Sequence, residues 1–200
     1  MAAIVGDNLD RVSSHGGLRL TAAEYFSLPD DGNVYELIDG VLVLSPSPTP
    51  RHQLVAKVIL RQLDDYVERG NLGLVLYETD VQLPTPPGGR DLVYRPAILY
   101  VAADRVGQIR GRIDIVPDLI VEVVSPDSRS LDTQTKRDDY ERAGVREYWL
   151  IDPEAERFTF FQRKDGAFGE VASSTTSYAS EVIPGFSLDL ARVRATFRSL

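Results

Sequence analysis

Two glutamates stand inside apolar segments, where a carboxylate is costly to bury. Glu122 lies in the middle of 118–124, and all the residues from 119 to 124 except Glu122 are aliphatic. Glu36 lies in 34–38, where two-residue alternation places it on the same strand face as apolar neighbours. An unpaired carboxylate is strongly unfavourable in an apolar interior. Each glutamate is therefore expected in a structural ion pair, or in a site that uses its charge as a metal ligand or general base.

Lys136 and Tyr140 are four residues apart in the polar segment 131–143. Residues at this spacing project from one face of a helix. The spacing by itself fits an ordinary solvated surface equally well. However, the segment follows the buried strand of Glu122, and sites in α/β proteins form at the carboxyl ends of strands. Carboxylates with a lysine suit metal-assisted attack on a phosphodiester, because the oxygens hold the ion and the ammonium stabilises developing negative charge.

Other reaction types lack the residues that they need. The sequence has no cysteine and only two histidines, His15 and His52. A thiolate zinc site and a cysteine nucleophile are thereby excluded, and oxygen ligands must hold any metal ion, which favours Mg²⁺ or Mn²⁺. The sequence contains no glycine-rich nucleotide loop, no G-x-S-x-G elbow and no H-E-x-x-H motif.

The elements that must position these residues alternate between strands and helices. Thr21 and Glu24 form a capping box, which predicts a helix over 22–28. Asp39-Gly40 predicts a hairpin that joins strands 34–38 and 41–44. The other predicted elements are a long amphipathic helix at 51–69 stopped by Gly70, strands at 73–83, 92–102, 118–124 and 148–151, a polar helix at 131–143 ended by Gly144, and a hairpin that turns at 164–166.

Length and composition are those of one folded domain. Of the 200 residues, 43% are hydrophobic and 26% are charged, which suffices for a sizeable core. Residues 1–17 resemble a flexible N-terminal extension and leave 18–200 as a single domain. No apolar run approaches the roughly 20 residues that cross a bilayer. The first residues also lack the pattern of a secretory signal, so we expect a cytoplasmic protein with no membrane partner.

The overall charge argues against a protein that coats DNA without sequence preference. The formal net charge is −8, whereas such proteins carry a basic excess. A local basic groove remains compatible with this charge. The candidate DNA-contacting residues are Arg51, Lys57, Arg61, Arg129 and Arg137. Of the first three, only Lys57 and Arg61 clearly share a helix face.

Several short motifs follow one another in a characteristic order. They are YELIDG at 35–40, SPSP at 45–48 with His52, Arg95-Pro96, PDLIVEVVSP at 117–126, the trio Asp132, Lys136 and Tyr140, and GVREYWLIDP at 144–153. This order resembles the Uma-type restriction endonuclease family of the PD-(D/E)XK nuclease superfamily. The resemblance extends from about residue 18 to about residue 190.

The resemblance implies an α/β fold with a restriction-endonuclease-like core, in which helices flank a mixed central sheet and an N-terminal hairpin is added. It implies Mg²⁺ or Mn²⁺ as cofactor, DNA as partner and a homodimer. Glu122 and Glu36 are the implied metal ligands. The superfamily's lysine usually stands two residues after the glutamate, where this chain has Val124, so Lys136 resembles a migrated lysine. Tyr140 joins the implied catalytic group, and His52 matches a recurrent position whose role stays open.

One position departs from the family pattern. The family has an aspartate after Arg-Pro, and this chain has Ala97. Loss of this carboxylate should lower metal affinity and water activation sharply. Three explanations stay open: an inactivating substitution was introduced, the natural protein is a degenerate nuclease, or another acid such as Asp80 or Asp91 serves instead.

Two main functions follow from these residues. The first is a metal-dependent DNA endonuclease, impaired or inactive in this chain because of Ala97. The alternative is a non-catalytic module on the same fold that binds nucleic acid or protein. A third and weaker option is a protein whose apolar edge strands serve only assembly.

Overall fold

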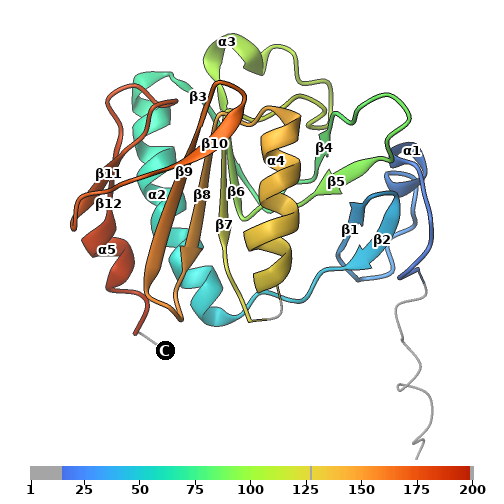
Figure 1. Cartoon of the computed structure of the whole chain (residues 1–200), viewed down its shortest axis with the longest axis horizontal. Helices are drawn as coiled ribbons and strands as arrows, with labels where there is room; N and C mark the ends of the chain where they lie inside the picture. Colours follow the sequence, from blue (N-terminus) through green and yellow to red (C-terminus); the bar gives the residue numbers. More distant parts are fainter. Residues whose placement is uncertain (1–14, 127, 199–200) are drawn as a thin grey trace, which may run out of the picture.

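A six-stranded mixed sheet forms the centre of the chain (Figure 1). The computed structural model describes residues 15–126 and 128–198. The strand order is β10-β9-β8-β7-β6-β3, and only β7 and β8 are parallel. The bounds are β3 Gly73–Tyr77, β6 Ile98–Ala102, β7 Leu119–Val123, β8 Glu147–Asp152, β9 Arg157–Lys164 and β10 Ala167–Val171. The predicted α/β fold with a mixed central sheet is confirmed.

Helices cover both faces of this sheet (Figure 1). Helix α2 (Pro50–Gly70) packs its apolar side against one face, and α4 (Arg137–Ala143) lies on the other. Because successive side chains of a strand point to opposite faces, Val121 of β7 packs in the α2 core and Ile120 in the α4 core. The same alternation directs Glu122 toward the α4 side.

A smaller four-stranded sheet lies beside the main one, with the order β2-β1-β5-β4. Its strands are β1 (Tyr35–Ile38), β2 (Val41–Leu44), β4 (Val81–Leu83) and β5 (Leu92–Tyr94). The predicted hairpin is confirmed, with Asp39 at φ 49° and Gly40 at φ 69° in the left-handed region that its turn requires. The capping box at Thr21 is also confirmed, although α1 (Ala22–Tyr25) ends earlier than predicted.

The predictions of continuous strands over 73–83 and 92–102 are wrong, because both segments break and supply strands to two sheets. The first breaks after Tyr77, where Glu78 adopts a left-handed φ of 44°. The second breaks at Arg95-Pro96, where proline provides no N–H for a strand ladder. The two breaks lie side by side, because the Glu78 N–H donates to the Ala97 carbonyl at 3.3 Å.

Two helix predictions also need correction. Gly70 belongs to α2, and Asn71 supplies the left-handed stop with φ 50°. The segment predicted as one polar helix begins as a π-helix, η1 (Leu131–Lys136), and continues as α4. Gly144 ends α4 with φ 95°, as predicted. Most of the predicted N-terminal extension, residues 1–14, lies outside the described residues.

Within the described parts of the chain, no helix has both the length and the apolar character needed to cross a membrane.

The closing C-terminal segment is attached to the sheet through the buried carboxylate of Glu147. This segment contains β11 (Ser177–Ala179), β12 (Ser187–Asp189) and α5 (Leu190–Arg194). Glu147 accepts hydrogen bonds from Ser180 Oγ at 2.8 Å and from the backbone N–H groups of Glu181 and Val182 at 3.0 and 3.2 Å. Its other oxygen accepts from the Trp149 indole at 2.7 Å. Glu147 is therefore a structural residue.

We expect Glu147→Gln to destabilise the chain by about 1.5–3 kcal/mol, because hydrogen bonds to a charged acceptor are lost and an amide NH₂ faces other donors. Urea unfolding measures this change. The matched control, Glu170→Gln on exposed β10, should stay within about 0.5 kcal/mol of the parent. Equal stability of the two variants would contradict the structural role.

Candidate active site

A single buried ammonium group contacts three carboxylates. Lys136 is only 5% exposed, and its Nζ lies 2.9 Å from Glu36 Oε1, 3.1 Å from Glu122 Oε1 and 3.5 Å from Asp132 Oδ1. All three acidic side chains are also buried. The structure thus brings Glu36, Glu122 and Lys136 together, as the sequence predicts for a shared site.

These residues come from three parts of the chain. Glu36 belongs to β1 of the small sheet, Glu122 to the central strand β7, and Asp132 and Lys136 to successive turns of η1. The break at Arg95-Pro96 contributes two donors: the Arg95 N–H donates to Glu36 Oε1 at 2.8 Å, and the Ala97 N–H donates to Glu122 Oε2 at 3.3 Å. The strand break therefore holds both glutamates.

Tyr140 binds the carboxylate of Glu122 from within the core. Its hydroxyl donates to Glu122 Oε1 at 2.8 Å, and its ring packs edge-on against Tyr94. Burial, with the nearby charge of Glu122, raises the pKa of Tyr140 well above its usual value, so the hydroxyl remains a donor. Tyr140 is fully buried and does not line the cavity described below. Tyr140 therefore orients Glu122 and does not itself reach the cavity.

Burial and neighbouring charges together shift the pKa values within the cluster. Burial raises the pKa of Asp132 to about 7, with the charge of Glu122 adding to this shift. Burial also raises the pKa of Glu36. Burial alone would lower the pKa of Lys136, but the charges of Glu122, Glu36 and Asp132 outweigh it and raise that pKa. Lys136 is therefore a permanent cation, and three acidic groups share it.

The cluster borders a cavity of about 430 Å³. Glu36, Glu122, Asp132 and Lys136 line it, and so does Ala97, which is 5% exposed. The position at which the resemblance implies an aspartate therefore faces the same cavity as the acidic cluster. A side chain longer than alanine at this position would stand beside Glu122.

Neither acid considered as a replacement for the missing aspartate lines this cavity. Asp80 pairs with the Arg95 guanidinium at 2.6 and 3.0 Å. Asp91 accepts a hydrogen bond from the Ala22 N–H at 2.7 Å. Asp132, in contrast, does line the cavity, although it was absent from the predicted catalytic and metal-ligand set. Its spacing of four residues before Lys136 was the available signal.

His52 contributes an unpaired imidazole nitrogen. It lines the cavity, and its Nδ1 is buried without a hydrogen-bond partner. Burial lowers the pKa of His52, with Glu78 acting in the opposite direction. The side chain is therefore neutral near pH 7 and retains an unsatisfied polar atom near the cavity.

The residues present do not form a complete site for a divalent ion. Carboxylates are suitable ligands for Mg²⁺ and Mn²⁺. Across residues 15–126 and 128–198, however, no group of three or more His, Cys, Asp or Glu is arranged to hold a metal ion. Lys136 contacts both Glu36 and Glu122, and Ala97, at the position where the resemblance implies an aspartate, contributes only a methyl group.

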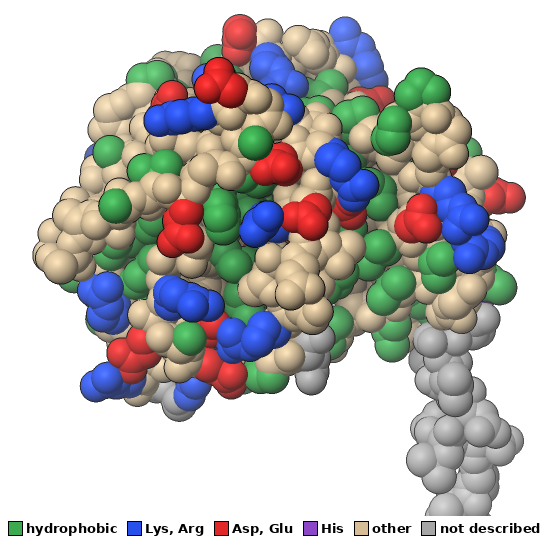
Figure 2. Space-filling view, in the orientation of Figure 1, with side chains coloured by type: hydrophobic (Ala, Val, Ile, Leu, Met, Phe, Trp, Pro, Cys, Tyr) green, Lys and Arg blue, Asp and Glu red, His purple; other side chains and the backbone are tan. Residues whose placement is uncertain are grey.

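The predicted DNA-contacting residues do not gather at this cavity. Arg129 pairs with Asp152, and Arg137 lies 3.3 Å from Asp138. Lys57 and Arg61 are exposed on α2, and Arg51 is half-buried near the start of that helix. On the face viewed in Figure 2, basic and acidic side chains are interspersed.

The comparisons with known proteins identify the family. The family model Uma2, described as "Putative restriction endonuclease", matches residues 22–191. The chain belongs to this family. A crystal structure described as "a putative nuclease belonging to DUF820" from Anabaena variabilis superposes with a TM-score of 0.74 at 16% identity, covering 89% of this chain and 99% of that one. This likeness shows that the two chains share a fold. A comparison with curated proteins found no match.

We expect Lys136→Met to destabilise this Uma2-family chain by about 3–5 kcal/mol at pH 8, because three buried carboxylates lose their shared counter-charge. The loss should shrink toward pH 5. The pKa values of Glu36 and Asp132 are raised in the folded state, so the folded chain binds protons at these groups more tightly than the unfolded chain does. Their protonation therefore stabilises the fold at low pH, and this stabilisation is lost as the pH rises.

Urea unfolding at pH 5 and pH 8 measures both effects. Lys164→Met, at an exposed position of β9, is the matched control and should change stability little at either pH. A loss for Lys136→Met that is small, or that grows as the pH falls, would contradict the shared-ammonium arrangement.

Proposed function

We propose that this chain carries the phosphodiester-hydrolysing site of a metal-dependent DNA endonuclease, and that Ala97 impairs this site. The observation that carries the proposal is the cluster of three buried carboxylates around Lys136, at the edge of a cavity. Replacing a buried ion cluster with apolar residues of similar volume is often neutral or stabilising, so stability alone is a weak reason to keep such a cluster. Its place on the cavity wall favours a chemical use.

The charge of the cluster explains why a cation would be needed. With all groups ionised, the three acids outnumber the one ammonium, so the cavity wall carries excess negative charge. A phosphodiester is itself an anion and is repelled by such a wall. Family membership supports a divalent cation as the compensating charge, and Ala97 removes the carboxylate that should help to bind it.

The protein's own groups have separate roles in this proposal. Lys136 stands at the cavity wall, where an ammonium can contact a phosphate oxygen and stabilise negative charge. Tyr140 and the Ala97 N–H fix the orientation of Glu122. Held in this way, Glu122 loses little conformational freedom when a ligand binds.

Ala97 also supports the second candidate function, a non-catalytic module that binds nucleic acid or protein. A methyl group in place of a central ligand suits a chain that retains the fold and a binding cavity without turnover. The homodimer and the cytoplasmic location stay predictions, and sedimentation of the purified chain tests the first of them.

We expect Ala97→Asp to create measurable Mn²⁺ and Mg²⁺ binding, because it adds a carboxylate beside Glu122. Calorimetric titration detects the binding directly. The buried new charge should lower stability in EDTA, and metal should restore it. Ions at 100 times their Kd add about 2.7 kcal/mol. DNA cleavage by this variant, with little or none by the parent, is the result expected for an impaired nuclease.

Ala97→Asn is the matched control, since it has nearly the same shape without the charge. It should show neither the metal response nor cleavage. DNA binding without cleavage in both the parent and Ala97→Asp would favour the binding module. An Ala97→Asp protein that folds and shows no metal response would contradict the proposed site.

A further inference from the structure

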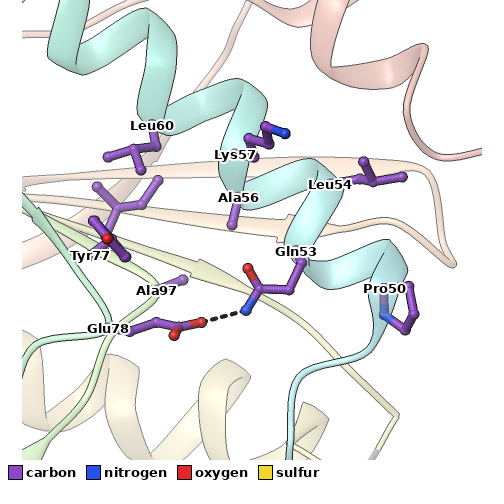
Figure 3. A pocket seen from close by; sticks show the side chains of 10 residues that line it. Pro50, Gln53, Leu54, Ala56, Lys57, Leu60, Tyr77, Glu78 and Ala97 are labelled. Atoms are coloured by element: carbon purple, nitrogen blue, oxygen red, sulfur yellow. Dashed lines mark hydrogen bonds between the residues drawn. The ribbon is translucent and has the colours of Figure 1, made fainter.

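A second cavity lies between the first half of α2 and the end of edge strand β3 (Figure 3). Its volume is about 540 Å³, within the range of about 300–1,000 Å³ that is typical of small-ligand pockets. Apolar side chains form most of its wall, namely Leu54, Ala56, Leu60, Tyr77 and Ile98. Glu36, Glu122, Asp132 and Lys136 do not line this cavity.

The two cavities adjoin, because Glu78 and Ala97 line both of them. Glu78 is held at the junction by its left-handed backbone, with φ 44°, and by its N–H bond to the Ala97 carbonyl. A left-handed conformation is uncommon for a glutamate. Because the two cavities share Glu78 and Ala97, a ligand group beside the acidic cluster would be adjacent to the apolar cavity.

The second cavity combines an aromatic wall with a polar edge. Tyr77 is 62% exposed, which is unusual for a large aromatic side chain in a folded protein. At the other edge, Gln53 Nε2 donates to Glu78 Oε1 at 2.6 Å, as the dashed line in Figure 3 shows. Lys57 is also among the lining residues, although Figure 3 shows its ammonium group pointing away from Tyr77 and Glu78.

These features match the chemistry of a nucleobase. A base presents a flat face that stacks on aromatic rings, and polar edges that bond to amide and carboxylate groups. The sugar–phosphate backbone of the same nucleotide would pass Glu78 and Ala97, which line both cavities, toward the acidic cluster. A peptide or a second copy of the chain could also cover apolar residues, but neither requires an adjoining phosphate site.

We propose that this cavity binds an unstacked nucleobase, so that the preferred substrate is single-stranded or locally opened DNA. The inference rests on the proposed function, because it places the phosphate next to that base in the cavity of Glu122 and Lys136. A base paired within a duplex is not free to enter such a cavity, and enzymes that bind a single base take it out of the stack.

Fluorescence anisotropy tests the proposal with the full chain in MnCl₂. The probe is a labelled single strand of about 12 nucleotides, compared with the same sequence as a duplex and as a strand of abasic sites. The parent should bind the single strand most tightly. Tyr77→Ala should weaken that binding about tenfold or more, since stacking on one aromatic side chain is worth about 1–3 kcal/mol per base.

Two matched variants isolate the stacking. Tyr77→Phe keeps the ring and should retain nearly full affinity for the single strand. Leu18→Ala removes another large exposed apolar side chain, 46% exposed, and should leave affinity unchanged.

Three results would overturn the inference in distinguishable ways. If the single strand binds but neither Tyr77→Ala nor abasic sites weaken binding, the base pocket is wrong and the proposed function stands. If neither the parent nor Ala97→Asp binds any DNA, the proposed function fails and the pocket with it. If Tyr77→Ala abolishes self-association seen by sedimentation without changing DNA affinity, a second copy of the chain occupies the cavity.

Discussion

The shared ammonium of Lys136 is the interaction on which the candidate site depends. It joins Glu36 of the small sheet to Glu122 of the main sheet, with Asp132 one helical turn away. Three acidic groups at such short distances would repel one another strongly in a buried place without a cation. The same contact therefore links the N-terminal hairpin to the central sheet, alongside the Arg95 N–H bond to Glu36, and shapes the electrostatics of the cavity.

The breaks in two strands make this arrangement possible. Had 73–83 and 92–102 continued as regular strands, the N–H groups of Arg95 and Ala97 would be directed into strand ladders. The breaks instead free both groups to hold Glu36 and Glu122. They also bring Glu78 to Ala97, so that one short region of backbone borders the acidic cavity and the apolar one.

The sequence predicted the parts of the site that leave a strong local signal. A glutamate inside an aliphatic strand and a lysine four residues before a tyrosine pointed to Glu122, Lys136 and Tyr140, and the structure places all three in contact. Asp132 was named among the family-like motifs but not assigned to the site, because acidic residues are common in polar helices and its burial depends on packing against distant strands. The strand breaks were missed for a related reason: Glu78 is not a typical left-handed residue, and tertiary contacts hold it there.

The central claim is that the cavity beside Glu122 is a nuclease metal site lacking one carboxylate. The most direct measurement is anomalous diffraction from crystals of the Ala97→Asp variant soaked in MnCl₂, with Ala97→Asn crystals treated identically. The account predicts a manganese peak next to Glu122 in the first crystals and none at that place in the second. No peak beside Glu122 in well-diffracting Ala97→Asp crystals, or equal peaks in both variants, would contradict it.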